Sequence, residues 1–266
     1  MYEPVNAAIW NVNPELIRLG PLAIRWYGLL FASGFYLGIL FFQHVFRREN
    51  RSMEDLGILF NYMVAGTVLG ARLGHCFFYE PAWYLAHPAE IIMIWRGGLA
   101  SHGGVIGILI ALYFYCRKRP DQNYLWVLDR IVIPTILTGA MIRIGNFFNS
   151  EILGVPTDLP WAVTFSQVDM LPRHPAQLYE SLSYFCIWLL LFLLYRRWGE
   201  KTPPGGLLGL FFILVFGARF FIEFIKERHT DLTADLPLSM GQMLSIPLVI
   251  AGIVLLVRAL RKTEHS

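Results

Sequence analysis

The chain has 266 residues, of which 56% are hydrophobic and only 15% are charged, and its formal net charge is +3. Because soluble domains carry about 25% charged residues, this composition excludes an ordinary soluble domain and indicates an integral membrane protein. The small net charge gives no basis for expecting a nucleic-acid partner.

Seven apolar runs follow one another along the chain, and each supplies most of a membrane-spanning helix, which needs about 20 residues. Their approximate bounds are 22–46, 56–79, 98–116, 125–148, 178–195, 206–225 and 240–260. We expect an all-α integral membrane protein with seven transmembrane helices, forming a single polytopic domain over residues 1–266. The long segment 149–177 is expected to form a periplasmic arm or head between spans four and five.

Basic residues are concentrated in alternate loops of this seven-span arrangement. Twelve of them follow spans one, three, five and seven: Arg47, Arg48, Arg51, Arg117, Lys118, Arg119, Arg196, Arg197, Lys201, Arg258, Arg261 and Lys262. The positive-inside rule places these loops in the cytoplasm, so we expect a periplasmic N-terminus and a cytoplasmic C-terminus. The first twenty residues lack the basic region of a cleavable signal peptide, and we expect span one to act as an uncleaved signal.

Two polar groups stand out in the first two spans. Tyr27 lies in IRWYG, residues 24–28, where span one begins, and it is either an interfacial aromatic residue or part of a polar site. Arg72 lies inside span two, where an arginine needs a partner, and we expect Glu80 or another buried acid to pair with it.

A histidine surrounded by glycines marks the start of span three. His102 lies in RGGLASHGGVIG, residues 96–107, and glycines permit either close helix approach or an unwound start to a span. The histidine is either a packed interfacial residue or a functional group. An unperturbed imidazole titrates near pH ~6.5, which suits proton transfer, so His102 is a candidate general base.

The end of span four carries the most informative polar stretch, GAMIRIGNFFNSEILG at residues 139–154. An arginine at membrane depth costs at least ~2.5–3.5 kcal/mol on insertion scales, so Arg143 needs a partner or a function. On a helix, Arg143, Asn146 and Ser150 fall on one face. Either Glu151 or loop carbonyls satisfy Arg143 structurally, or its planar guanidinium forms an anion site suited to phosphate.

The segment 149–177 that follows shows its own pattern. Trp161, Val163 and Phe165 alternate with other residues, which favours a short strand or a folded arm. The motif RHPAQLYE, residues 173–180, leads into span five and is more polar than a spanning helix requires. Polar residues therefore gather on the side of the membrane that the loop charges assign to the periplasm.

Span six ends in another charged pair. Arg219 and Glu223 are four residues apart, a spacing that allows an ion pair on one helix face. That pair can simply stabilise the helix. Alternatively, Arg219 and Arg143 lie at similar depth on different helices and can converge on one phosphate group.

Together these motifs resemble the prolipoprotein diacylglyceryl transferase family. The resemblance covers essentially the whole chain and rests on four motifs in order: HGG at 102–104, RIGNFFNSEILG at 143–154, RHPAQLYE at 173–180 and RFFIEF at 219–224. It implies a bacterial inner-membrane enzyme that moves the diacylglyceryl group of phosphatidylglycerol to the lipobox cysteine of a prolipoprotein signal peptide. It also implies that a thioether forms, that glycerol-1-phosphate leaves, and that no cofactor or metal takes part.

The resemblance also assigns roles to particular residues. The family's important residues correspond here to Tyr27, His102, Arg143, Asn146, Glu151, Gly154, Arg219 and Glu223. We expect His102, Arg143 and Arg219 to be catalytic. The two arginines are also expected to bind phosphatidylglycerol with the remaining members of that set. Family members often have a tyrosine shortly before the span-six arginine, where this chain has the sequence Val-Phe-Gly-Ala at 215–218.

An anion or lipid transporter is the main alternative, because intramembrane arginines and glycine-broken helices also occur in transporters. The sequence contains no internal repeat, and the inner halves of the expected spans are apolar, which favours an enzyme confined to one leaflet. A sensory seven-span protein is the weaker third alternative, since no long cytoplasmic loop is present.

Overall fold

The computed structural model describes residues 7–20, 22–94, 97–227 and 237–264 and forms two compact units. One comprises residues 1–41 and 128–266, and we call it the bundle unit; the other, residues 42–127, is the hairpin unit. The helices are α1 (Trp26–Arg48), α2 (Met53–Phe78), α3 (Pro81–Ala86), α4 (Ser101–Arg117), α5 (Tyr124–Phe148), α6 (Ala176–Trp198), α7 (Gly206–Ile222) and α8 (Met240–Glu264). Short 3-10 helices are η1 (Pro88–Ile92), η3 (Gly199–Lys201) and η4 (Glu223–Ile225).

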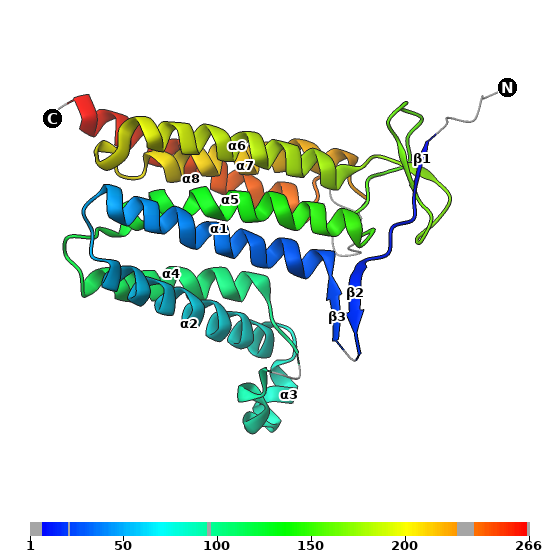
Figure 1. The fold of residues 1–266 in the computed structure, drawn as a ribbon, viewed down its shortest axis with the longest axis horizontal. Coiled ribbons are helices and arrows are strands. Elements are labelled where there is room, and N and C mark those ends of the chain that lie inside the picture. Colours follow the sequence, from blue (N-terminus) through cyan, green and yellow to red (C-terminus); the bar gives the residue numbers. More distant parts are fainter. Residues whose placement is uncertain (1–6, 21, 95–96, 228–236, 265–266) are drawn as a thin grey trace. The chain divides into compact units, whose positions relative to one another are not determined.

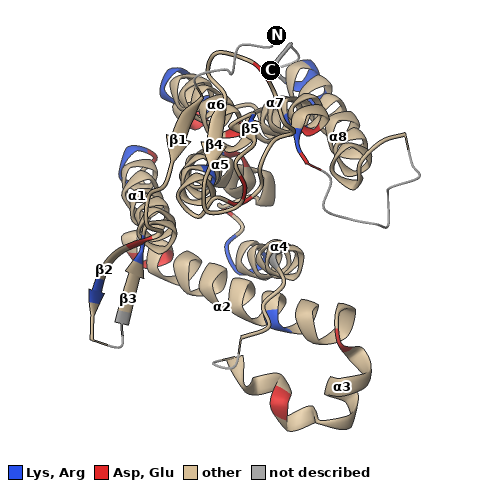
Figure 2. Ribbon diagram, turned by 90° about the vertical axis from the view of Figure 1, so that its right-hand side faces the viewer, with Lys and Arg blue, Asp and Glu red and all other residues tan. Residues whose placement is uncertain are grey.

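Six of the described helices are long and apolar enough to cross a membrane: α1, α2, α5, α6, α7 and α8. Most of the ribbon in Figure 2 is uncharged, as such helices require. The run expected to form the third span gives α4, which has only 17 residues and therefore a length of about 25 Å. Helix α4 does not extend back to Gly97 and Gly98, because their positive φ angles of 86° and 74° are incompatible with a helix.

The carbonyls of these glycines satisfy Arg72, which corrects the prediction of an acidic partner. The guanidinium of Arg72 donates to the backbone oxygens of Gly97 at 2.6 Å and Gly98 at 3.1 Å. It also donates to the carbonyls of Glu90 and Ile91 in η1. Arg72 therefore holds the partly helical segment between α2 and α4 in place, and its role is structural.

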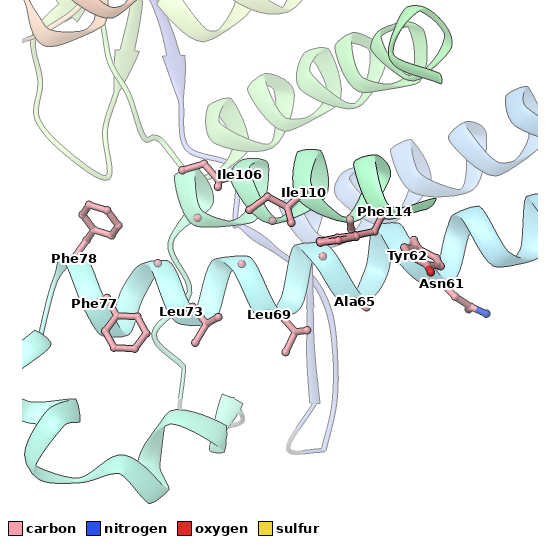
Figure 3. A pocket seen from close by; sticks show the side chains of 16 residues that line it. Asn61, Tyr62, Ala65, Leu69, Leu73, Phe77, Phe78, Ile106, Ile110 and Phe114 are labelled. Carbon is pink, nitrogen blue, oxygen red and sulfur yellow. The ribbon is translucent and has the colours of Figure 1, made fainter. Parts of the chain in front are cut away.

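Helices α2 and α4 of the hairpin unit pack through glycines. Gly66 and Gly70 face Gly107, and Gly74 faces Gly103, where an added Cβ at position 74 would lie 2.7 Å from a backbone Cα. The order of these contacts makes the pair antiparallel, and small residues are what permits helices to approach so closely in a membrane. Beside this seam runs an apolar groove of about 690 Å³, with Leu69 and Leu73 on the α2 side and Ile106, Ile110 and Phe114 on the α4 side (Figure 3).

In the bundle unit, α5, α6, α7 and α8 run side by side (Figure 1). Gly209 of α7 and Gly252 of α8 meet closely, because a Cβ on Gly209 would lie 2.8 Å from the Gly252 carbonyl oxygen. The Ser181 hydroxyl of α6 donates to the Ala140 carbonyl of α5 at 3.0 Å. These contacts join α7 to α8 and the start of α6 to the last third of α5.

The expected strand at 161–165 forms, and its partners come from distant parts of the chain. The strands are β1 (Ala8–Trp10), β2 (Glu15–Leu19), β3 (Leu22–Arg25), β4 (Val163–Phe165) and β5 (Pro172–Arg173). Strand β4 pairs in parallel with β1 and antiparallel with β5, while β2 and β3 form a separate hairpin. Trp10 of β1 packs on Phe147 at the end of α5, with ring centroids 4.3 Å apart. The segment 149–177 is thus a folded head attached to the end of α5.

Candidate functional site

Arg143 projects from the last turns of α5 and is nearly buried, with 15% of its side chain exposed. Its Nε lies 2.8 Å from Oε2 of Glu180 on α6. Its Nη1 donates to Oδ1 of Asn146 at 3.2 Å, and the Asn146 amide donates in turn to Glu151 at 3.1 Å. The acidic partner of Arg143 is therefore Glu180, whereas Glu151, the partner considered from sequence, is connected to it only through Asn146.

The chain leaves α5 through a strained turn that positions Glu151. Ser150 and Ile152 both have positive φ angles, of 54° and 56°, which are uncommon for residues other than glycine. The Glu151 amide donates to the Asn146 carbonyl at 2.9 Å, and the Gln177 amide group donates to the Glu151 carbonyl at 2.6 Å. The turn is thus closed by α6, and it aims the Glu151 carboxylate back at Asn146.

A second cation, Lys226, shares Glu180 with Arg143. The Lys226 Nζ lies 3.3 Å from Oε1 of Glu180 and 3.2 Å from Oε2 of Glu223. Glu180 is fully buried, and Lys226 has 10% of its side chain exposed. Positive and negative groups therefore alternate from Arg143 through Glu180 and Lys226 to Glu223 inside an apolar bundle.

The ion pair that the spacing of Arg219 and Glu223 allows does not form, because the Glu223 carboxylate pairs with Lys226 instead. Helix α7 ends at Ile222, and Glu223 begins the 3-10 helix η4. In a 3-10 turn residues i and i+3 eclipse, which brings Glu223 to Lys226 instead. Within the described part of the chain, the Arg219 guanidinium has neither an ion pair nor a hydrogen bond.

Arg219 and Arg143 nevertheless act on one common side chain. The buried hydroxyl of Tyr184 on α6 interacts electrostatically with both guanidinium groups. One arginine comes from α5 and the other from α7, and Tyr184 lies on the helix with the counter-charge Glu180. Two arginines that act on the same buried side chain are candidates for binding one phosphate group together.

Tyr27 and Gly154 occupy the edges of this network. Tyr27, in the first turn of α1, packs against Gly145 of α5, where a Cβ would lie 2.8 Å from its ring. Gly154 donates its amide to the His174 carbonyl at 3.1 Å and bridges Lys226 in an isolated β-bridge. A side chain at Gly154 would overlap His174, because its Cβ would lie 2.5 Å from that carbonyl oxygen. Gly154 therefore brings the backbone that carries Lys226 against the head.

Arg173 completes the attachment of the head. Its side chain donates to the Gly154 carbonyl at 3.2 Å and to Asp169, and it pairs with Glu227 at 3.3 Å. The hydrogen bond from Arg173 lowers the pKa of the Asp169 carboxyl below its usual range. These contacts keep the segment after α7 close to the residues that follow α5.

His102 belongs to the hairpin unit, whereas the other seven predicted site residues belong to the bundle unit. It lies in the first turn of α4 and is exposed. Its assignment as the general base stays a prediction. The sequence reasoning missed Lys226, which looked like an ordinary loop charge, and it noted Glu180 only as part of an unusually polar motif.

Comparisons with known proteins agree with this arrangement of motifs. A family model described as "Prolipoprotein diacylglyceryl transferase" matches residues 14–258. A phosphatidylglycerol–prolipoprotein diacylglyceryl transferase of Chloroherpeton thalassium is 55% identical over 255 residues, which cover 96% of this chain and 95% of the relative. The protein of the same name from Tolumonas auensis is 53% identical, covering 93% and 95%, and that from Bacteroides fragilis is 44% identical, covering 92% of each.

Proposed function

Because the chain belongs to the prolipoprotein diacylglyceryl transferase family, we propose that it transfers the diacylglyceryl group of phosphatidylglycerol to a prolipoprotein. The acceptor is the thiol of the lipobox cysteine in the signal peptide. A carbon–sulfur bond forms, the bond between that carbon and the phosphate oxygen breaks, and glycerol-1-phosphate leaves with the electron pair. The thiol proton is lost to a base.

The buried charge network at the ends of α5, α6 and α7 is the observation that carries this proposal. Negative charge grows on the leaving phosphate oxygen in the transition state, and preorganised cations lower the barrier most when they face that charge. We assign Arg143 and Arg219 to the phosphate because both act electrostatically on the buried side chain of Tyr184. The contact between Asn146 and Arg143 supports a role for Asn146 beside the headgroup.

The other site residues receive roles that follow from their contacts. Glu151 is placed to orient Asn146 or to contact the glycerol headgroup. Tyr27 lines the same end of α5, and Glu223 holds Lys226. Gly154 acts through the backbone. His102 is the proposed base, because a free thiol with a pKa near ~8.5 supplies little thiolate at neutral pH.

We place the protein in a bacterial inner membrane with the head in the periplasm and the C-terminus in the cytoplasm. Six long apolar helices support a multi-pass arrangement. In this topology α4 is the third of seven spans, although it is shorter than the others. A phospholipid substrate can then reach the charge network sideways from the bilayer, with its acyl chains in the membrane.

Turnover of labelled phosphatidylglycerol with a lipobox peptide tests the phosphate assignment. Arg143→Ala is expected to reduce transfer by at least about 100-fold, the scale on which single oxyanion-stabilising donors act. Arg18→Ala is the matched control, because Arg18 forms only a surface pair with Glu15. Near-normal transfer by folded Arg143→Ala protein would remove the assignment, and anion uptake without thioether product would favour a transporter.

A further inference from the structure

Glu180 is a fully buried carboxylate on α6, a helix long enough to cross a membrane. Burying a carboxylate incurs a large desolvation cost, which is offset only when cations are held in good geometry around it. Replacing such a group by an apolar one is often neutral or stabilising, so stability alone is a weak reason for its presence. The carboxylate is better explained by what it does to its neighbours.

The two carboxylate oxygens of Glu180 pair with two cations from different parts of the chain. Oε2 lies 2.8 Å from Nε of Arg143 on α5, and Oε1 lies 3.3 Å from Nζ of Lys226 beyond α7. Its own helix is fixed on both sides of it. Gln177 donates to the Glu151 carbonyl, and Ser181 donates to the Ala140 carbonyl of α5. The position of the carboxylate on α6 is thus set by hydrogen bonds to two backbone carbonyls, one in α5 and one in the turn that follows it.

This geometry selects one orientation of Arg143. A guanidinium has five N–H donors in a rigid fork. Glu180 faces its Nε, and Asn146 accepts from Nη1. The guanidinium also interacts with the buried Tyr184 side chain of α6. The contacts with Glu180 on α6 and Asn146 on α5 together restrict the rotamers that Arg143 can adopt.

We propose that Glu180 is a positioning residue of the transfer site, whose buried carboxylate fixes Arg143 and Lys226 around the phosphate of phosphatidylglycerol. This inference rests on the proposed function, in which Arg143 contacts that phosphate. Glu180 acts through the two cations and does not touch the lipid. Its loss leaves Arg143 charged but free to adopt other rotamers, which weakens the part of binding that depends on orientation.

The test compares Glu180→Gln, Lys226→Gln and the double variant Glu180→Gln/Lys226→Gln in the full-length protein. Labelled phosphatidylglycerol and a lipobox peptide are the substrates, and kcat and both KM values are measured. The double variant removes one negative and one positive charge, so the net charge of the network is unchanged. Glu15→Gln is the matched control, because Glu15 is a carboxylate that pairs with Arg18 at the surface.

Glu180→Gln is expected to lower kcat/KM for phosphatidylglycerol at least about tenfold while KM for the peptide changes less than about twofold. The double variant is expected to remain as impaired as Glu180→Gln, because Arg143 still lacks its anchor. Recovery in the double variant would mean that Glu180 only neutralises Lys226 and would overturn the proposal. Equal losses for both substrates, activity within twofold of wild type, or failure of both Glu180 variants to fold would overturn it as well.

The outcome for Arg143 separates this inference from the proposed function. If Arg143→Ala is inactive and Glu180→Gln is fully active, the phosphate assignment stands and the positioning role is wrong. If Arg143→Ala keeps its activity, the phosphate assignment itself is wrong.

Discussion

At the scale of single residues, the sequence predicted which positions are polar better than it predicted their partners. Arg143 and Arg219 were recognisable because charges are costly inside apolar segments. The sequence did not identify Glu180 as the partner of Arg143, because the two residues lie on different helices and no spacing rule connects them. Arg72 was misassigned because backbone carbonyls at Gly97 and Gly98 satisfy it, and carbonyl direction is not visible in a sequence.

The base that activates the thiol is the residue-scale prediction that matters most for the mechanism. General base catalysis contributes typically 10²–10⁴-fold, so His102→Gln is expected to lower kcat by at least about 100-fold near neutral pH. Its residual rate is expected to rise with pH as the thiolate fraction of the peptide increases. The measurement is a pH–rate profile of peptide modification.

His87→Gln is the control for this experiment, because His87 lies in the same unit and stacks on Trp83 at the exposed segment after α3. If His102→Gln retains most of its activity with an unchanged pH profile, His102 is not the base. The cationic field of the two arginines would then have to generate the thiolate.

At the scale of elements, the length of the apolar runs predicted the long helices, and alternation predicted the strand that became β4. The pairing of β4 with β1 could not be predicted from the sequence. The register joins Ala8 to Val163, which are far apart in the chain, and each strand has only three residues. The end of α7 was also missed. Helix α7 gives way to the 3-10 helix η4 at Glu223, and the carboxylate of Glu223 pairs with Lys226 rather than with Arg219.

At the junction between the head and the end of α7, adding a single methyl group at Gly154 is expected to lower both stability and transfer activity. In Gly154→Ala the new methyl would lie 2.5 Å from both the Cβ and the carbonyl oxygen of His174. Overpacking of this kind costs about 1–3 kcal/mol, so thermal unfolding is expected at lower temperature. Transfer is expected to fall as well, because Lys226 is displaced from Glu180.

Gly217→Ala is the matched control for the glycine substitution. An added Cβ at Gly217 meets nothing within 4 Å, and alanine favours the helix in which it lies. Its melting temperature is expected to equal or exceed that of the wild type. If Gly154→Ala is as stable and as active as Gly217→Ala, the close packing at this junction is not required.

At the scale of the whole molecule, composition alone identified a multi-pass membrane protein, and six described helices confirm it. The order of the motifs predicted the family, and the match over residues 14–258 confirms that prediction. The seven-span topology and its orientation stay predictions, because they rest on loop charges and on a short α4. The folded head shows that the segment between α5 and α6 is more than a connection.

The most direct test of the central claim is mass spectrometry of a lipobox peptide incubated with the purified protein and phosphatidylglycerol. The account predicts that the peptide gains one diacylglyceryl group on its cysteine sulfur and that glycerol-1-phosphate appears in equal amount. An unmodified peptide, with folded protein and intact lipid, would contradict it, as would a modified cysteine without release of glycerol-1-phosphate.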